Sequence, residues 1–339
     1  MKVAVLGRGL AGCFSALHYA HYAKADVEMI HDSNTPPQIV GQGTFPDAAD
    51  MLWDACQLDW NHNPIRSTVK TGILYEGWGK KNDEFFHPFP LGHQAVHYDT
   101  TALQDYVVGS GKFKVTDRRI NAYDEIDADY VFDCRGFPED YSEYILLKNP
   151  VDSVILGLKE GADASCLWTR SVATPDGWCF VIPLQGVTSH GYIYNSEITT
   201  KEEATRNFQS MFDIDEITGA STFKHYVARQ PIRDERIILQ GNRLFFLEPL
   251  EATAVTSYIT WNKLTYDWLV SGVTHPEAIM HLFKEQIDRI QNFILYHYLH
   301  GSRYDTPFWK HAATYEIDDP LFFQIMDTCV RMQGSLTSS

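Results

Sequence analysis

The chain has 339 residues, 44% of them hydrophobic, and its 44 acidic against 28 basic side chains give a net charge of −16, which argues against the basic face that nucleic-acid binding requires. Its six cysteines include no Cys-x-x-Cys pair, so neither a disulfide framework nor a structural zinc or other metal site is expected. Because it shows no cationic leader and no run of 18 apolar residues, we expect a cytoplasmic protein without a membrane partner, long enough for one big or two modest domains.

The first predicted unit is a strand, a turn and a helix. Residues 2–6 form an apolar run, residues 10–23 carry apolar side chains at roughly helical spacing, and residues 26–31 form a second strand candidate. In the turn, Gly7 permits a tight bend, Gly9 lets the backbone approach a pyrophosphate, and Gly12 allows close helix packing. The unit predicts a dinucleotide site whose phosphate contacts come from the segment Gly7, Gly9, Leu10, Ala11 and Gly12.

The ribose-binding acid that should end the second strand has several candidates. Flavoproteins of this type carry Glu where this chain has His31. Asp32 or Glu28 could take its place, and a solvated surface carboxylate is the alternative for both. Residues 34–44 contain glycine and proline breakers and predict a loop across the nucleotide site. Gln42 and Thr44 of this loop are further candidate cofactor contacts.

The remaining elements predict an α/β fold with a discontinuous first lobe. Residues 129–134 form a buried-strand pattern, and an antiparallel sheet is expected from the apolar runs at 151–158, 166–172, 178–184 and 187–194. Helices are predicted at 255–270 and 275–300, with Pro276 in the first turn of the second. The predicted parts are a Rossmann-like nucleotide-binding lobe (1–150 and 235–270), an inserted β-rich substrate lobe (151–234) and a C-terminal helical segment (271–339).

Several side chains could carry chemistry, and each also has a structural explanation. Lys70 enters a half-buried strand, either as a snorkelling surface residue or as a functional ammonium. Glu248 and Glu251 stand three apart around Pro249 and could cap the following helix. His87 could be a core histidine with a satisfied hydrogen bond, or it could stack on an aromatic ligand. The residues alone leave these alternatives open.

Four segments in this order resemble the flavin-dependent halogenases of the tryptophan halogenase family. They are the glycine turn, Thr68-Val69-Lys70-Thr71-Gly72-Ile73, Gly177-Trp178-Cys179-Phe180-Val181-Ile182-Pro183 and Leu247-Glu248-Pro249-Leu250-Glu251-Ala252-Thr253. The family's Lys-x-Gly-Ile-x-Phe-like strand implies that Lys70 is catalytic. Its Glu-Pro-Leu-Glu-Ser-Thr segment implies Glu251 as the second catalytic residue and the amides of Ala252 and Thr253 as the halide site, although Ala252 replaces a serine.

The resemblance also implies substrate and tunnel residues. Phe86-His87-Pro88-Phe89 is similar to a family segment whose His and Phe flank an aromatic ring, which implies His87 and Phe89 as substrate-binding residues. The Trp-x-Trp-x-Ile-Pro signature, with Phe in place of its second Trp, implies a flavin-side tunnel wall made of Trp178, Phe180, Ile182 and Pro183. The similarity ends near residue 310, and a structural role is expected for 289–298 and 303–309. A short variant form, such as a phage-type halogenase with a more open pocket, is expected.

The activity implied by the resemblance is halogenation of an electron-rich aromatic small molecule of the indole or phenol type. Reduced FAD from a separate flavin reductase, O2 and chloride, bromide or iodide would yield hypohalous acid. This oxidant would hydrogen-bond to the ammonium of Lys70 or convert it to a haloamine, and Glu251 would stabilise the cationic ring or accept its proton. A homo-oligomer, either a dimer or a trimer, is expected.

Two alternatives share the same fold. An FAD-dependent monooxygenase, a hydroxylase or epoxidase, would transfer oxygen without halide and would not need Lys70. A non-catalytic flavin-binding protein would turn over nothing.

Overall fold

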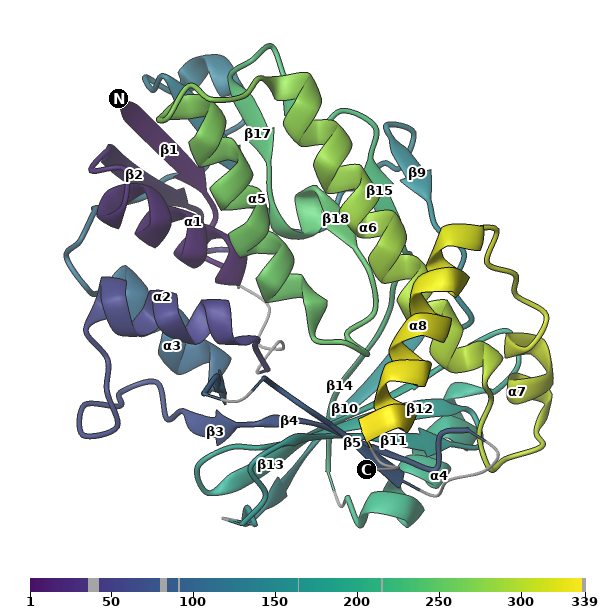
Figure 1. Ribbon diagram of the computed structural model, residues 1–339. Coiled ribbons are helices and arrows are strands. Elements are labelled where there is room, and N and C mark those ends of the chain that lie inside the picture. Colours follow the sequence, from purple (N-terminus) through teal and green to yellow (C-terminus); the bar gives the residue numbers. More distant parts are fainter. Residues whose placement is uncertain (36–42, 80–83, 91, 164, 215, 337–339) are drawn as a thin grey trace.

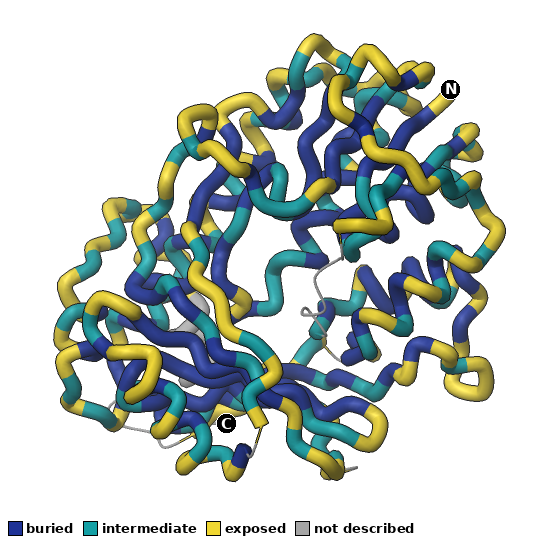
Figure 2. Tube along the Cα trace, turned by 180° about the vertical axis from the view of Figure 1, so that it is seen from behind, coloured by how far each residue is buried: buried dark blue, intermediate teal, exposed yellow. Residues whose placement is uncertain are grey.

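Two large β-sheets with helices around them make up the computed structural model, which describes residues 1–35, 43–79, 84–90, 92–163, 165–214 and 216–336 (Figure 1). Buried backbone runs through the interior of both sheets, and exposed backbone lies in the outer turns and helix surfaces (Figure 2). The arrangement confirms the predicted α/β fold class. In the described part of the chain, no helix has both the length and the apolar character needed to cross a bilayer.

The first sheet has the order β16-β17-β8-β1-β2-β7. Its strands are β1 (Lys2–Leu6), β2 (Asp26–His31), β7 (Lys114–Asp117), β8 (Tyr130–Asp133), β16 (Ile232–Arg233) and β17 (Ile237–Leu239). All neighbours pair in parallel except β16 and β17. Helix α1 (Leu10–His21) leads from β1 to β2, as the apolar spacing predicts, and gives the Rossmann-like unit in which nucleotides bind at the carboxyl ends of the strands.

The second sheet has the order β14-β10-β13-β12-β11-β4-β5 and is antiparallel except where β11 and β4 pair. Its strands are β4 (Gly72–Glu76), β5 (Glu84–Pro88), β10 (Ser153–Glu160), β11 (Thr169–Thr174), β12 (Gly177–Pro183), β13 (Val187–Tyr194) and β14 (Ile217–Thr222). The predicted boundaries assign β4 and β5 to the first lobe, whereas the structure joins them to this sheet. Their partner β11 lies far along the chain, and a local pattern cannot reveal such a pairing.

Two small sheets connect the large ones. Strand β3 (Thr68–Lys70) pairs with β6 (Ala95–His97), and β15 (Tyr226–Ala228) pairs with β9 (Tyr144–Leu146) and β18 (Phe245–Phe246). Only Thr71 separates β3 from β4, and its N–H donates to the carbonyl of Leu167 at 2.7 Å. Lys70 therefore stands at the junction where the chain leaves a two-stranded sheet and enters the seven-stranded one.

The predicted C-terminal helices are present as α5 (Thr253–Leu269) and α6 (Pro276–Leu299), and Pro276 occupies the first turn of α6. The remaining helices are α2 (Pro46–Cys56), α3 (Thr100–Val108), α4 (Lys201–Phe212), α7 (Pro307–Ala312) and α8 (Pro320–Leu336). Helix α4 lies in the stretch predicted to be β-rich, in which no helix was predicted. Its signal is Thr200, whose hydroxyl caps the N–H of Glu203 in a Ser/Thr-x-x-Glu pattern.

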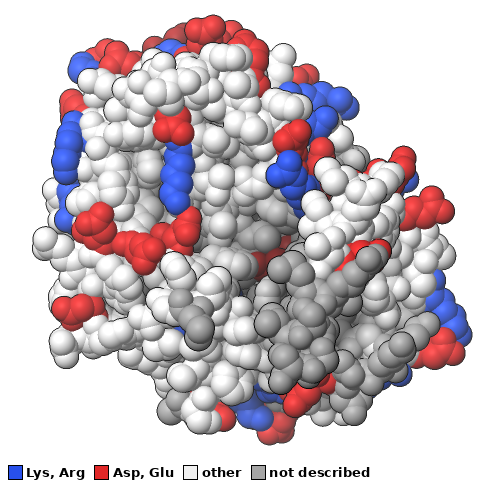
Figure 3. Space-filling model, in the orientation of Figure 1, with Lys and Arg blue, Asp and Glu red and all other residues white. Residues whose placement is uncertain are grey.

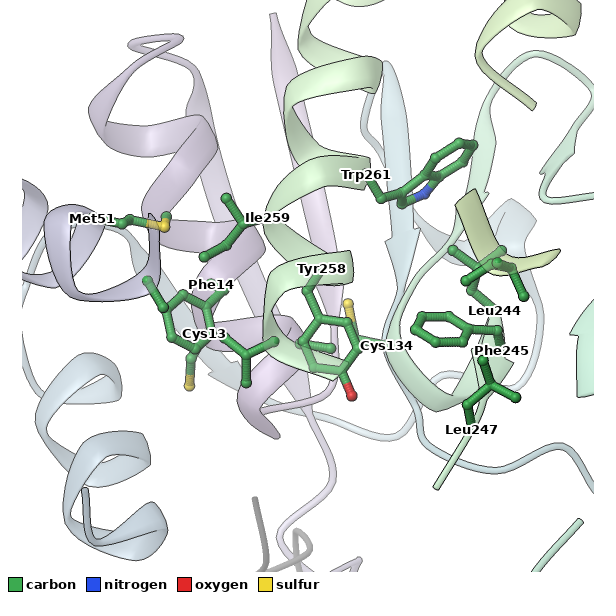
Figure 4. Close-up of a cluster of buried hydrophobic side chains, with 14 of the residues drawn as sticks. Cys13, Phe14, Met51, Cys134, Leu244, Phe245, Leu247, Tyr258, Ile259 and Trp261 are labelled. Carbon is green, nitrogen blue, oxygen red and sulfur yellow. The ribbon is translucent and has the colours of Figure 1, made fainter. Parts of the chain in front are cut away.

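Helix α5 contributes buried side chains to the core, on the side of the first sheet and on the side of the helices that follow it. Figure 4 shows Ile259 on the side of Phe14 and Met51, and Trp261 on the side of Phe245. Burying each such side chain contributes about 1.5–3 kcal/mol. The indole N–H of Trp261 donates to the carbonyl of Leu239 at 3.0 Å, so the only polar atom of this side chain is satisfied.

The surface carries mixed charge. On the face in Figure 3, basic side chains lie among acidic ones, and no continuous basic patch is seen outside the grey atoms. Opposite charges also pair on the surface, as Lys263 of α5 does with Asp47 of α2 at 2.7 Å. The view agrees with the charge balance of the sequence.

Candidate active site

The glycine turn has the geometry of a phosphate-binding loop. Gly7 has a left-handed φ of +101°, and a Cβ on it would stand 2.8 Å from the carbonyl oxygen of Cys134. A Cβ on Gly12 would stand 2.0 Å from the carbonyl oxygen of Gly7, so the helix packs directly on the turn. Gly9 is the N-cap of α1, and the space in front of its Cβ position is open to 4 Å. Leu10 and Ala11 begin the helix, where first-turn amides have no acceptor within the helix and favour an anion.

The two ribose-acid candidates lie in different surroundings. Glu28 pairs with Lys114 at 2.8 Å and accepts a hydrogen bond from Thr116 at 2.6 Å, so the neighbouring strand engages it. Asp32 follows the carboxyl end of β2, and one of its oxygens accepts from the backbone and side chain of Asn34 at 2.9 Å. Asp32 is therefore the better placed of the two for a nucleotide at this edge of the sheet.

The loop candidates give a mixed result. Gln42 lies outside the described residues. Thr44 is fully buried, and its hydroxyl donates to the carbonyl of Val96 at 2.7 Å and accepts from the amide of Val96 at 3.0 Å. Through these two hydrogen bonds the side chain of Thr44 joins the loop to β6, and its contact with the cofactor stays a prediction.

Lys70 is fully buried, and among the described residues its Nζ atom has no hydrogen-bond partner. The ammonium lies over the rings of Phe45 and Phe89, 5.4 and 5.5 Å from their centroids. A Cβ on Gly43 would approach Nζ to 3.7 Å, so the glycine leaves room beside the amine. Burial lowers the pKa of Lys70 to about 7, and the Glu251 carboxylate opposes this shift.

Glu251 lies in the same buried site. Its Oε1 atom accepts from the hydroxyl of Tyr75 and contacts Nε2 of His297 at 2.7 Å. Burial raises the pKa of Glu251 to about 7, while the hydrogen bond from Tyr75 and the charge of Lys70 lower it. The structure thus brings together the two residues that the sequence singled out, although they are far apart in the chain. The gain or loss of one proton by Lys70 or by Glu251 would therefore change the net charge of the site.

Glu248 has a different environment. It is fully buried and accepts hydrogen bonds from Asn149 at 2.9 Å, Trp178 at 2.7 Å and Tyr298 at 2.9 Å. These donors lie on three separate segments. Glu248 therefore ties the turn before α5 to the second sheet and to α6, and the three bonds account for its burial.

The predicted halide site is only partly available. Ala252 adopts a left-handed φ of 50°, and its N–H donates to the carbonyl of Pro249 at 2.8 Å. This bond closes the turn and removes one of the two predicted amide donors. Thr253 begins α5, where amides lack acceptors within the helix and favour an anion.

The aromatic strand β12 connects the two halves of the site. Trp178, Phe180, Ile182 and Pro183 are all buried, and the ring of Phe180 lies where a Cβ on Gly191 would stand. The hydroxyl of Thr68 donates to the carbonyl of Pro183 at 2.8 Å, which joins β12 to the strand of Lys70. At the other end of β12, the indole N–H of Trp178 donates to Glu248, which lies three residues before Glu251.

The predicted substrate residues lie on the edge strand β5 and just beyond it. Phe89 is half-buried with its ring 5.2 Å from that of Phe45, and both face Lys70. His87 is exposed and acts electrostatically on His297, which faces Glu251. No group of three His, Cys, Asp or Glu side chains is placed to hold a metal ion in the described ranges.

Sequence reasoning missed three residues of the site. Phe45 carried no signal, because it follows an irregular loop. Tyr75 stands where the family pattern of this strand has Phe, and that departure is a signal for an added hydroxyl. His297 lies in a segment given only a structural role, yet its imidazole contacts the Glu251 carboxylate.

Comparisons with known proteins identify a family for this chain. The family model described as tryptophan halogenase matches residues 2–123 and 106–329. Tryptophan 7-halogenase RebH of Lentzea aerocolonigenes is 27% identical, over 91% of this chain and 78% of that protein. Tryptophan 6-halogenase ThaL of Streptomyces albogriseolus is 23% identical, over 70% of this chain and 48% of that protein.

Solved structures share the fold. The tryptophan 6-halogenase SttH from Streptomyces toxytricini has a TM-score of 0.82 at 19% identity, covering 96% of this chain and 84% of that one. MibH, a lathipeptide tryptophan 5-halogenase, has a TM-score of 0.80 at 21% identity, covering 92% and 75%. At these identities the likeness concerns the fold alone.

Proposed function

This chain belongs to the tryptophan halogenase family, and from that premise we propose that it is an oxidoreductase that halogenates an electron-rich aromatic small molecule of the indole or phenol type. Chloride, bromide or iodide and O2 would be co-substrates, and a separate flavin reductase would supply reduced FAD. The observation that most supports this is the buried Lys70 ammonium, which has no hydrogen-bond partner among the described residues and interacts electrostatically with Glu251. Buried amines with a shifted pKa are typical of functional sites.

The glycine turn fits FAD. The open space at Gly9 would admit a pyrophosphate, and the first-turn amides of Leu10 and Ala11 would donate to it. Asp32 would bind the ribose. Bound in its reduced form, FAD would supply one pair of the electrons that reduce O2; the halide would supply the other pair as it becomes hypohalous acid, with water as the second product.

Lys70 would hold the electrophilic halogen. With a pKa of about 7, its ammonium and its free amine are both populated near neutral pH. The ammonium can donate a hydrogen bond to hypohalous acid, or the free amine can take the halogen from it, forming an N–halogen bond and releasing water. Phe45 and Phe89 shield the amine from bulk solvent in either case.

Glu251 would serve as the base. When the ring carbon bonds to the halogen, its C–H proton must leave so that the electron pair returns to the aromatic system. An ionised carboxylate beside the ring accepts that proton and stabilises the cation before it leaves. Thr253 would contribute its amide to the halide, and His87 and Phe89 would flank the ring. The buried β12 strand would separate the ring from the flavin.

The direct test is product formation with purified protein, FAD, a flavin reductase, NADH and a panel of indoles and phenols. We expect mass spectra with the isotope pattern of the added chloride or bromide, or the mass shift of iodide, and no such product when halide is omitted. An oxygenated product that forms without halide would instead support a monooxygenase. Absence of any product across the panel would contradict the proposed activity.

Two glycine substitutions test the cofactor assignment. Gly9→Ala adds a methyl group into open space, so we expect roughly a 10-fold or greater loss of FAD affinity with an unchanged melting temperature. Gly12→Ala forces a Cβ against the carbonyl of Gly7, so it should lower the melting temperature itself. Fluorescence titration with FAD and thermal unfolding without it separate the two effects. Equal FAD affinity in Gly9→Ala and the native chain would rule out this phosphate site.

A further inference from the structure

Two residues that are far apart in the sequence contact the same oxygen of Glu251. Tyr75 of β4 donates its hydroxyl to Oε1, and Nε2 of His297 of α6 stands 2.7 Å from the same atom. Both of these contacts fall on Oε1. The carboxylate is therefore held through one of its two oxygens.

Tyr75 is itself held rigidly. It is fully buried, its ring stacks on that of Phe85 at 4.7 Å with an interplanar angle of 7°, and it meets the edge of Trp78 at 6.2 Å. The Lys-x-Gly-Ile-x-Phe-like pattern that this strand resembles has Phe at this position, where this chain has Tyr. Burial beside Glu251 raises the pKa of Tyr75, and the phenol stays protonated and able to donate.

His297 is enclosed by aromatic rings. The centroids of Phe293, Tyr75 and Trp78 lie 4.8, 5.0 and 5.9 Å from that of its imidazole. Burial lowers the pKa of His297 to about 3, so the ring is neutral at physiological pH. A neutral imidazole beside a carboxylate donates through the nitrogen that faces it, here Nε2.

We propose that Tyr75 and His297 are positioning residues that clamp Oε1 of Glu251, keep the carboxylate ionised and leave Oε2 to meet the substrate. The inference deepens the proposed function, since it assigns which oxygen of the proposed base takes the ring proton. Hydrogen bonds to the charged form favour ionisation of a buried carboxyl group. Two donors on one oxygen also fix the rotation of the carboxylate, which a proton transfer requires.

The clamp acts among few titratable groups. Lys70 of β3 and Tyr75 of β4 lower the pKa of Glu251, and burial raises it. His297 faces Glu251 from α6 and is itself influenced by His87 of β5 and His300 of α6. Removing the Tyr75 hydroxyl takes away a contribution that lowers the pKa of Glu251. The carboxyl group would then need a higher pH to ionise.

The main test is Tyr75→Phe, with Tyr298→Phe as the matched control. Both remove one buried phenol hydroxyl that donates to a glutamate, and the two glutamates, Glu251 and Glu248, stand three residues apart. Infrared difference spectra of the protein alone, without flavin or halide, follow each carboxyl group through its titration. Glu251→Gln and Glu248→Gln assign the two bands.

We expect Tyr75→Phe to move the titration midpoint of Glu251 upward by about one pH unit, and Tyr298→Phe to leave it in place. In the halogenation assay, the acid limb of the kcat profile should move by the same amount, which is about a tenfold loss on the acid side, with KM unchanged. His297→Gln keeps an N–H donor and should stay closer to the native midpoint than His297→Leu.

Each outcome decides a separate point. A Glu251 midpoint that is equal in Tyr75→Phe, His297→Leu and the native protein would overturn the clamp. A midpoint that moves in a protein that halogenates nothing would support the clamp and reject the proposed function. If Tyr75→Phe moves the titration midpoint of Glu251 and the acid limb of the kcat profile by the same amount, the result supports both the clamp and the proposed function.

Discussion

Replacing Lys70 by Met is expected to abolish halogenation and, at the same time, to stabilise the folded protein. The variant removes the only atom proposed to carry the electrophilic halogen, so the rate of product formation should fall by at least about 10³-fold. Methionine fills a similar volume between Phe45 and Phe89 without a charge. Liquid chromatography with mass detection measures the loss, and thermal unfolding measures the gain.

The gain in stability has a defined pH range. The pKa of Lys70 falls from its ordinary value of 10.5 to about 7 on folding, so the unfolded chain binds more protons between these values. The destabilising cost of the buried ammonium is therefore complete below about pH 7 and is gone above about pH 10.5. We expect Lys70→Met to raise the free energy of unfolding by about 1–4 kcal/mol at pH 6, and by much less near pH 10.

Lys263→Met is the matched control for this experiment. It removes an exposed lysine that pairs with Asp47 at 2.7 Å on the surface of the first lobe. Exposed pairs contribute about 1 kcal/mol or less, and this one lies outside the proposed chemistry. Its activity should equal that of the native chain. Native halogenation by Lys70→Met would refute the role given to this lysine.

Glu251→Gln is expected to separate oxidation of halide from halogenation of the ring. The amide cannot accept the ring proton, so product formation should fall by about 10²- to 10⁴-fold. Hypohalous acid should still form, because the proposed mechanism gives Glu251 no part in its production. A small electron-rich dye in solution would trap the oxidant and report its rate of formation in the same sample.

Glu248→Gln provides the comparison for the second experiment. Glu248 accepts three hydrogen bonds and holds the turn, so its replacement should lower the melting temperature more than Glu251→Gln does. It should keep a larger share of the halogenating activity. Loss of dye bleaching together with loss of product in Glu251→Gln would mean that Glu251 acts before the halogen reaches Lys70.

Local patterns were sufficient for the first strand-turn-helix-strand unit and for much of the second sheet. The glycine spacing predicted a turn whose φ of +101° at Gly7 and tight contact at Gly12 match the expectation. The predicted strand at 187–194 has the bounds of β13. These features depend on neighbours in the chain, which is the information that a periodicity or a turn motif contains.

Features that depend on distant segments were not predictable in this way. The pairing of β4 with β11 and the contact of His297 with Glu251 join residues that no local pattern relates. Among such distant residues, the family resemblance related only Lys70 and Glu251 to one another. It also suggested an amide at Ala252 that the left-handed turn engages internally, because a motif of side chains does not specify where each N–H points.

Strand β12 joins the two segments that carry Lys70 and Glu251. At one end of this strand, the carbonyl of Pro183 accepts a hydrogen bond from Thr68, which lies on the same strand as Lys70. At the other end, Trp178 donates to Glu248, which lies in the turn that carries Glu251. The strand therefore tethers the segment that carries the amine to the turn that carries the carboxylate. Changes of substrate scope are better sought on the exposed strand β5, where altered side chains leave this tether intact.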